Sequence, residues 1–297
     1  MAFLSWVVTE RAAMTTFQIP SEYANVAPII ITSPTTRCGT TLVQRLLSMS
    51  SNGFIYGETN GNHFAILTEM FIGTLQYLDK SGDIVDADFQ HALAGDLTDW
   101  RPGLMPPTAV MVETLAETFY GMPVTLARHA ASVGRPVWGF KYPGFKRDTI
   151  KALLRIMPQC KVVYVFRNLF DTLKSAKARQ FVKTDGDVRT YCAQWGKNMS
   201  EMAEMAENER ILFVKYESLV EQRDEHIKLL EMFTGARELK PAAFDIKVNT
   251  FLGEKKDGHS PKQYIEPAKL TKTDRATVLE QAGAIMEHLY SDMMKAA

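Results

Sequence analysis

The 297-residue chain lacks features that mark several large classes of protein. Its 34 basic and 34 acidic residues cancel at pH 7, which argues against nucleic acid as the main partner because that binding needs a basic surface. Its three cysteines, Cys38, Cys160 and Cys192, are too widely spaced for a disulfide framework or a metal-ligand pattern. The apolar run at residues 3–8 is far shorter than the about 20 residues that cross a membrane. We therefore predict a soluble, cytoplasmic protein that needs no metal.

The chain does have enough apolar residues for a substantial core. Hydrophobic residues make up 46% of it, and no repeat, low-complexity tract or long linker divides it. Apolar, β-branched runs alternate with helical periodicity, which predicts an α/β fold with a mainly parallel sheet. We expect a single domain over residues 1–297, as a monomer or homodimer, with strands near residues 29–32, 54–56, 137–140, 162–166 and 211–215.

Residues 28–47 predict a strand, a tight loop and a helix. In such a junction the loop amides and the free N–H groups of the first helical turn meet at one point, which suits a phosphate. Thr40 and Thr41 add hydroxyl donors, and Arg37 adds a fixed charge. The ATP-type P-loop is excluded because it would need glycine at Pro34 and lysine at Thr40. An ordinary turn whose Thr40 caps the helix is the alternative.

Two further stretches carry groups that suit proton transfer or charge neutralisation. Residues 57–63 read as an irregular turn after the second strand, with Glu58 and His63 as the groups able to move a proton. A solvated turn carboxylate and a surface histidine are the alternatives. Lys141 ends the third predicted strand, so we expect it to point into the crevice where open α/β sheets bind ligands.

Arg167 ends the fourth predicted strand, and Ser175 lies two turns into the helix that follows. Both side chains could then hold one oxyanion, with the guanidinium giving a bidentate grip. A salt bridge from Arg167 to Asp171 is the alternative.

Together these segments resemble the sulfotransferases that use 3′-phosphoadenosine 5′-phosphosulfate (PAPS). Residues 36–42, Thr-Arg-Cys-Gly-Thr-Thr-Leu, are similar to the family's 5′-phosphosulfate loop. Arg167, Asp171 and Ser175 match the spacing of its 3′-phosphate motif. The Gly-Glu-Thr turn at residues 57–59 resembles the turn that supplies the general base in tyrosylprotein and several bacterial sulfotransferases. The resemblance spans about residues 28–219 and implies a three-layer, P-loop-like fold.

The resemblance also implies roles for individual residues. Glu58 would be the base, with His63 as the substitute, while Arg37 and Lys141 would neutralise charge on the transferring sulfuryl group. The residues implied to bind the nucleotide are Arg37, Cys38, Gly39, Thr40, Thr41, Leu42, Arg167, Ser175 and Tyr216. The chain departs from the family pattern at Cys38, where serine is usual, and lacks a clear Arg-Lys-Gly near its end. Lys255 or Lys256 could serve in its place.

Residues 64–133 show a long helical pattern, broken at residues 96–107. We predict a helical insertion that acts as a lid and forms the acceptor pocket, although core packing explains any single aromatic equally well. The predicted reaction moves a sulfuryl group from PAPS to a hydroxyl or amine of a small soluble metabolite of secondary metabolism. It leaves adenosine 3′,5′-bisphosphate (PAP). A small-molecule kinase with a degenerate phosphate loop and a non-catalytic PAP-binding protein are the alternatives.

Overall fold

A five-stranded sheet forms the centre of the computed structural model, which describes residues 19–96, 104–246 and 265–294. All its strands are parallel, in the order β2-β3-β1-β4-β5. Each strand lies within one residue of its predicted bounds at both ends, so the strand predictions are confirmed. The strands are β1 (Ile29–Thr32), β2 (Gly53–Tyr56), β3 (Val137–Lys141), β4 (Lys161–Phe166) and β5 (Ile211–Lys215).

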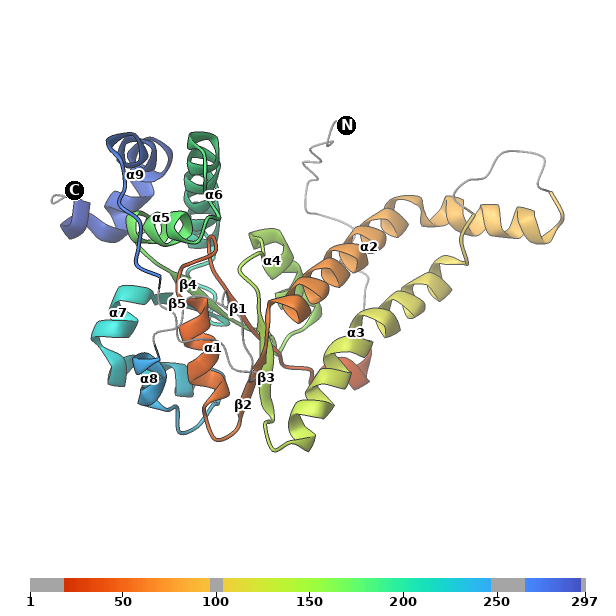
Figure 1. Cartoon of the computed structure of the whole chain (residues 1–297). Helices are drawn as coiled ribbons and strands as arrows, with labels where there is room; N and C mark the ends of the chain where they lie inside the picture. The colour runs from red at the N-terminus through yellow and green to blue at the C-terminus, as the bar shows by residue number, and fades with distance from the viewer. Residues whose placement is uncertain (1–18, 97–103, 247–264, 295–297) are drawn as a thin grey trace, which may run out of the picture.

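Helices cover both faces of the sheet (Figure 1). Alternate strand residues belong to different cores: Ile30 packs in one cluster, whereas Ile29 and Ile31 pack in the other. The smaller cluster draws on α1 (Thr40–Ser48), α7 (Tyr216–Glu221) and α8 (Arg223–Thr234). The larger cluster draws on α2 (Glu58–Leu93), α3 (Thr108–Ser132), α4 (Arg147–Ile156), α5 (Leu169–Ala178), α6 (Asp185–Ala203) and α9 (Lys272–Met294). The predicted three-layer α/β fold is confirmed.

The topology places a crevice at the carboxyl ends of the central strands. β1 is followed by α1 on one face, whereas its neighbours β3 and β4 are followed by α4 and α5 on the other. Ligands bind in open α/β sheets at such a point, because the connecting loops diverge there.

Helices α2 and α3 form a long hairpin that projects from the body of the protein (Figure 1). Near the sheet the two helices pack through stacked aromatic rings, with ring centroids 5.5 Å apart for Phe64 and Phe119 and 4.8 Å apart for Phe71 and Phe119. The predicted helical character of residues 64–133 is confirmed for the residues that the structure describes. None of the described helices combines the length and apolar character needed to cross a membrane.

The irregular turn predicted at residues 57–63 is wrong, because α2 begins at Glu58. The glycine that suggested a turn has a packing role instead. A Cβ atom at Gly61 would lie 2.6 Å from Cβ of Tyr142 and 3.0 Å from the carbonyl oxygen of Lys141. Glycine therefore lets the first turns of α2 lie directly against the end of β3, which brings Glu58 to the crevice.

Candidate active site

The carboxyl edge of the sheet gathers a predicted residue from the end of every strand. The loop after β1 carries Arg37, and β2 leads through one glycine to Glu58. Lys141 is the last residue of β3, while Arg167 and Tyr216 directly follow β4 and β5. Because parallel strands end at one edge, residues predicted from five separate segments meet in one region.

The loop after β1 has an unusual backbone. Arg37 and Gly39 both adopt left-handed conformations, with φ of 73° and 99°. A Cβ atom at Gly39 would lie 2.2 Å from the Tyr216 ring, so the position requires glycine. Left-handed conformation is costly for arginine, and such strain concentrates at functional sites. The loop therefore holds a specific shape at the N-terminus of α1, whose free N–H groups favour an anion.

Thr40 and Thr41 are the first residues of α1. Thr40 is buried and Thr41 is exposed, while Leu42 is half-buried. The N-cap residue is Gly39, and no side chain caps the helix. Thr40 therefore does not cap the helix, contrary to that part of the alternative.

Helix α6 supports the loop from the side. The Tyr191 hydroxyl donates a hydrogen bond to the carbonyl oxygen of Thr36, and the side-chain amide of Asn198 donates one to that of Pro34, each at 2.6 Å. Burial raises the pKa of Tyr191, so the hydroxyl stays protonated and available as a donor. In the sequence, Val188, Trp195 and Met199 recur at helical spacing along α6, which indicates core packing. Its helical periodicity carries no signal for these two bonds.

Cys38 points into the protein rather than toward the crevice. Its side chain is fully buried in the larger core, with Sγ 3.8 Å from Oγ1 of Thr35. Burial raises the pKa of the thiol. At this position only the Cys38 backbone is therefore available to an anion held by the loop.

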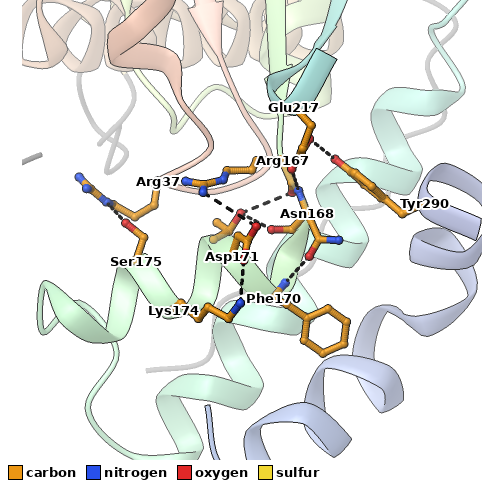
Figure 2. A network of polar contacts seen from close by, with 10 residues as sticks. Arg37, Arg167, Asn168, Phe170, Asp171, Lys174, Ser175, Glu217 and Tyr290 are labelled. Atoms are coloured by element: carbon orange, nitrogen blue, oxygen red, sulfur yellow. Dashed lines mark hydrogen bonds and ion pairs between the residues drawn. The ribbon is translucent and has the colours of Figure 1, made fainter. Parts of the chain in front are cut away.

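Arg37 reaches across the crevice to α5, where its Nε atom donates to Oγ of Ser175 at 3.0 Å (Figure 2). Arg167 stands beside this contact. One of its terminal nitrogens lies 4.0 Å from Oδ2 of Asp171, whereas Lys174 Nζ lies 2.8 Å from the other oxygen, Oδ1. The salt bridge from Arg167 to Asp171, which was the alternative to an anion-binding role, is thus present but long. It leaves Arg167 and Ser175 on the same side of α5 as Arg37.

Tyr216 and Glu217 join this region to the end of β5. The Arg167 guanidinium carbon lies 4.6 Å from the centre of the Tyr216 ring, and that ring packs on Gly39. Glu217 accepts hydrogen bonds from the backbone N–H of Asn168, at 2.9 Å, and from the Tyr290 hydroxyl, at 3.3 Å (Figure 2). These contacts fix the start of α5, where Asn168 is the N-cap residue.

Glu58 and Lys141 form an ion pair in which the Lys141 ammonium donates to the Glu58 carboxylate. The two partners differ in exposure, because 54% of the Glu58 side chain is accessible and only 7% of the Lys141 side chain. The carboxylate can therefore be reached by a ligand while the lysine holds it in place. His63 lies more than one turn further along α2 and is exposed, and no contact of its side chain joins it to this pair.

Positive charge is concentrated around Arg37. Burial lowers the pKa of Arg37, and the charges of Arg179 and Arg167 lower it further. Arg179 is buried at the end of α5 and was not singled out from the sequence. Repulsion within such a group is relieved when an anion binds among its members.

The remaining predictions for this site concern residues elsewhere. Lys255 and Lys256 lie outside the described residues. Within the described ranges, no three His, Cys, Asp or Glu side chains are grouped so that they could hold a metal ion.

Comparisons with known proteins identify one family. A model described as "Sulfotransferase family" matches residues 28–239. The fold resembles the sulfotransferase domain of the Synechococcus PCC 7002 olefin synthase, with 16% identity, a TM-score of 0.51 and coverage of 91% of this chain and 98% of that one. A sulfotransferase from Mycobacterium tuberculosis H37Rv is 16% identical, with a TM-score of 0.41 over 75% of this chain and 72% of that one. No curated protein sequence matches the chain.

Proposed function

This chain belongs to the sulfotransferase family, and we propose that it transfers a sulfuryl group from PAPS to a hydroxyl or amine of a small molecule, releasing PAP. The observation that carries the proposal is the contact between Arg37 and Ser175. It joins the loop after β1 to α5, and so unites two anion-binding segments that the sequence predicted separately. One nucleotide with a phosphate at each end of its ribose suits such a paired site.

In this proposal the two segments hold different phosphates. The loop amides, Thr40 and Thr41 bind the 5′-phosphosulfate at the N-terminus of α1. Arg167 and Ser175 bind the 3′-phosphate beside α5. Tyr216 packs on Gly39 and Arg167, so that it fixes the positions of the two segments relative to each other. The cation-rich surroundings of Arg37 fit a donor with this much negative charge.

Glu58 is proposed as the general base. It accepts the proton of the acceptor hydroxyl or amine while the acceptor oxygen or nitrogen forms a bond to sulfur. The bond between sulfur and the bridging phosphate oxygen breaks, and PAP carries away the electron pair. Arg37 and Lys141 neutralise charge on the sulfuryl and bridging oxygens. The ion pair with Lys141 supports this role, since it holds the accessible Glu58 carboxylate at the end of β3.

The acceptor is proposed to bind between the crevice and the α2–α3 hairpin. Glu58 is the first residue of α2, so the proposed base and the hairpin are parts of one helix. Movement of the hairpin would then open or close access to the carboxylate.

Incubation of the purified protein with ³⁵S-labelled PAPS and panels of alcohols and amines tests the proposal. We expect one class of acceptor to yield a labelled product together with an equal amount of PAP, in the presence of a metal chelator. PAP binding with no product from any acceptor would instead indicate a binding protein. Phosphorylation of an acceptor by ATP and Mg²⁺ would indicate a kinase. Either result would contradict the proposal.

A further inference from the structure

Helix α2 carries an exposed row of residues that repeats at heptad spacing. The row, which we call the α2 seam, consists of Ile66, Met70, Gly73, Tyr77, Lys80 and Ile84. Residues spaced alternately three and four apart lie along one line of a helix, and this is the spacing that packs against a second helix in a coiled coil. All six residues are exposed, and the four large apolar ones are between 44% and 63% accessible.

The seam is separate from the side of α2 that packs in the core. That side carries Phe71, Leu78 and Val85, each buried and each one position after a residue of the seam. One position corresponds to about 100° around a helix, so the seam points away from the core side. The hairpin of α2 and α3 projects from the body of the protein (Figure 1). Single exposed apolar residues are common, whereas a continuous row of them marks an interaction surface.

The seam is complementary in shape to a second copy of itself. When two α2 helices run antiparallel and cross midway between Gly73 and Tyr77, each Tyr77 meets the partner's Gly73. A Cβ atom added at Gly73 would have no atom within 4 Å, so there is room for an aromatic ring over this position. At both ends of the contact, Ile66 meets the partner's Ile84. This is the large-to-small packing of knobs into holes.

The charges fit the same antiparallel pairing. Lys80 then lays its apolar stem on the partner's Met70 and brings its ammonium group beside the partner's Glu69. Lys80 and Glu69 are both exposed, and the twofold axis makes the contact twice. In this pairing the acidic residues Glu69, Asp79 and Asp83 do not oppose one another, so the contact contains no repulsive pair of carboxylates.

We propose that the protein forms a twofold-symmetric dimer through the α2 seam, with a second copy of this chain as the partner. The contact extends from Ile66 to Ile84, about 27 Å along the helix. The inference does not rest on the proposed function. It does place the end of the partner's hairpin beside Ile66, which lies about 12 Å along α2 from Glu58.

Sedimentation velocity of the full chain over a range of concentrations tests the proposal. We expect a reversible dimer with a dissociation constant of about 1–100 µM, because one helix pair is smaller than the standard interface of about 1,600 Å². Tyr77→Glu should weaken the dimer at least about 100-fold, since it places two carboxylates in the apolar seam. Leu279→Glu is the matched control, because Leu279 is 46% exposed on α9, away from the hairpin (Figure 1), and should leave the dimer unchanged.

An exchange of charges tests the antiparallel pairing itself. Lys80→Glu and Glu69→Lys each place like charges together at both contacts, and each variant alone should associate about tenfold more weakly than the wild type. In an equimolar mixture of the two variants, both contacts again join opposite charges. The mixture should therefore dimerise about as tightly as the wild type. Both changes are on the surface, so the melting temperatures should stay near the wild-type value.

The outcomes that would overturn the inference are distinct from those that bear on the proposed function. A wild-type protein that stays monomeric at all concentrations, or a dimer that Tyr77→Glu leaves intact, would overturn the inference. A mixture of the charge variants that associates no more tightly than either variant alone would do the same. A monomer whose melting temperature falls in Tyr77→Glu would show that another segment of the same chain covers the seam, against the proposal. None of these results changes the expected binding of PAP.

Discussion

Arg37 Nε donates a hydrogen bond to Ser175 Oγ at 3.0 Å, although 138 residues separate the two in the chain. The contact crosses the crevice from the loop after β1 to α5, two segments that follow neighbouring strands. A left-handed backbone at Arg37 makes the reach possible. The proposed nucleotide site is therefore assembled by the sheet topology and closed by one arginine.

The shape of the loop depends on Gly39. In Gly39→Ala, the new methyl group would collide with the Tyr216 ring in a conformation that alanine disfavours by about 1–2 kcal/mol. We expect at least about tenfold weaker PAP binding and a lower melting temperature. Gly73→Ala is the control, because Gly73 lies in α2 with no atom within 4 Å of the added Cβ. It should stabilise the protein by about 0.5–1 kcal/mol and leave PAP affinity unchanged.

Tyr191 is expected to contribute to nucleotide binding without touching the nucleotide. Tyr191→Phe removes the hydrogen bond to the carbonyl oxygen of Thr36 and loosens the loop. A net hydrogen bond contributes about 1 kcal/mol, so PAP affinity should fall about fivefold by calorimetry. Tyr77→Phe changes an exposed tyrosine of α2 in the same way and should have no effect. Wild-type affinity in Tyr191→Phe would show that the loop keeps its shape without α6.

Cys38→Ser tests whether the departure from the family's serine matters. The side chain is buried away from the crevice, so PAP affinity should stay within a few-fold of wild type. Burying a hydroxyl instead of a thiol should lower stability by about 1 kcal/mol. Cys160→Ser places the same change in a buried position directly before β4 and should lower stability by a similar amount. A large loss of affinity confined to Cys38→Ser would mean that the loop binds its nucleotide differently from the family.

Glu58→Gln should separate the transfer step from nucleotide binding. The amide cannot accept the acceptor proton, so kcat should fall by about 10²-fold or more while PAP affinity stays within a few-fold. His63→Gln is the control on the same helix and should keep near-wild-type turnover. Near-wild-type turnover in Glu58→Gln would exclude it as the base, and His63 would then be the next residue to test.

The sequence was sufficient for the five strands, because strands buried on both faces show continuous β-branched runs. The sequence was insufficient where the role of a residue depends on contacts with segments far away in the chain. Gly61 suggested a turn, yet it lets α2 lie against β3. Arg179 has no local pattern that separates it from a surface arginine. Its burial depends on tertiary packing around the end of α5.

The hydrogen bond between Tyr191 and Thr36 could not be predicted from the sequence for a similar reason. A tyrosine at helical spacing with Val188 and Trp195 predicts core packing, and Tyr191 does pack against the larger core. The hydroxyl at its end reaches a loop carbonyl that belongs to another segment. Periodicity reports which side of a helix is apolar, but it does not report which backbone group lies beyond that side.

Titration of the wild-type protein with PAP, and separately with ATP and Mg²⁺, tests the central claim most directly. The two anion-binding segments predict that PAP binds even when a metal chelator is present. They also predict that PAP binds more tightly than adenosine 5′-phosphate (AMP), which lacks the 3′-phosphate. They also predict that ATP with Mg²⁺ binds weakly, because the loop after β1 has no P-loop lysine at Thr40. Tight, Mg²⁺-dependent binding of ATP with no preference for PAP over AMP would contradict the proposed sulfotransferase site.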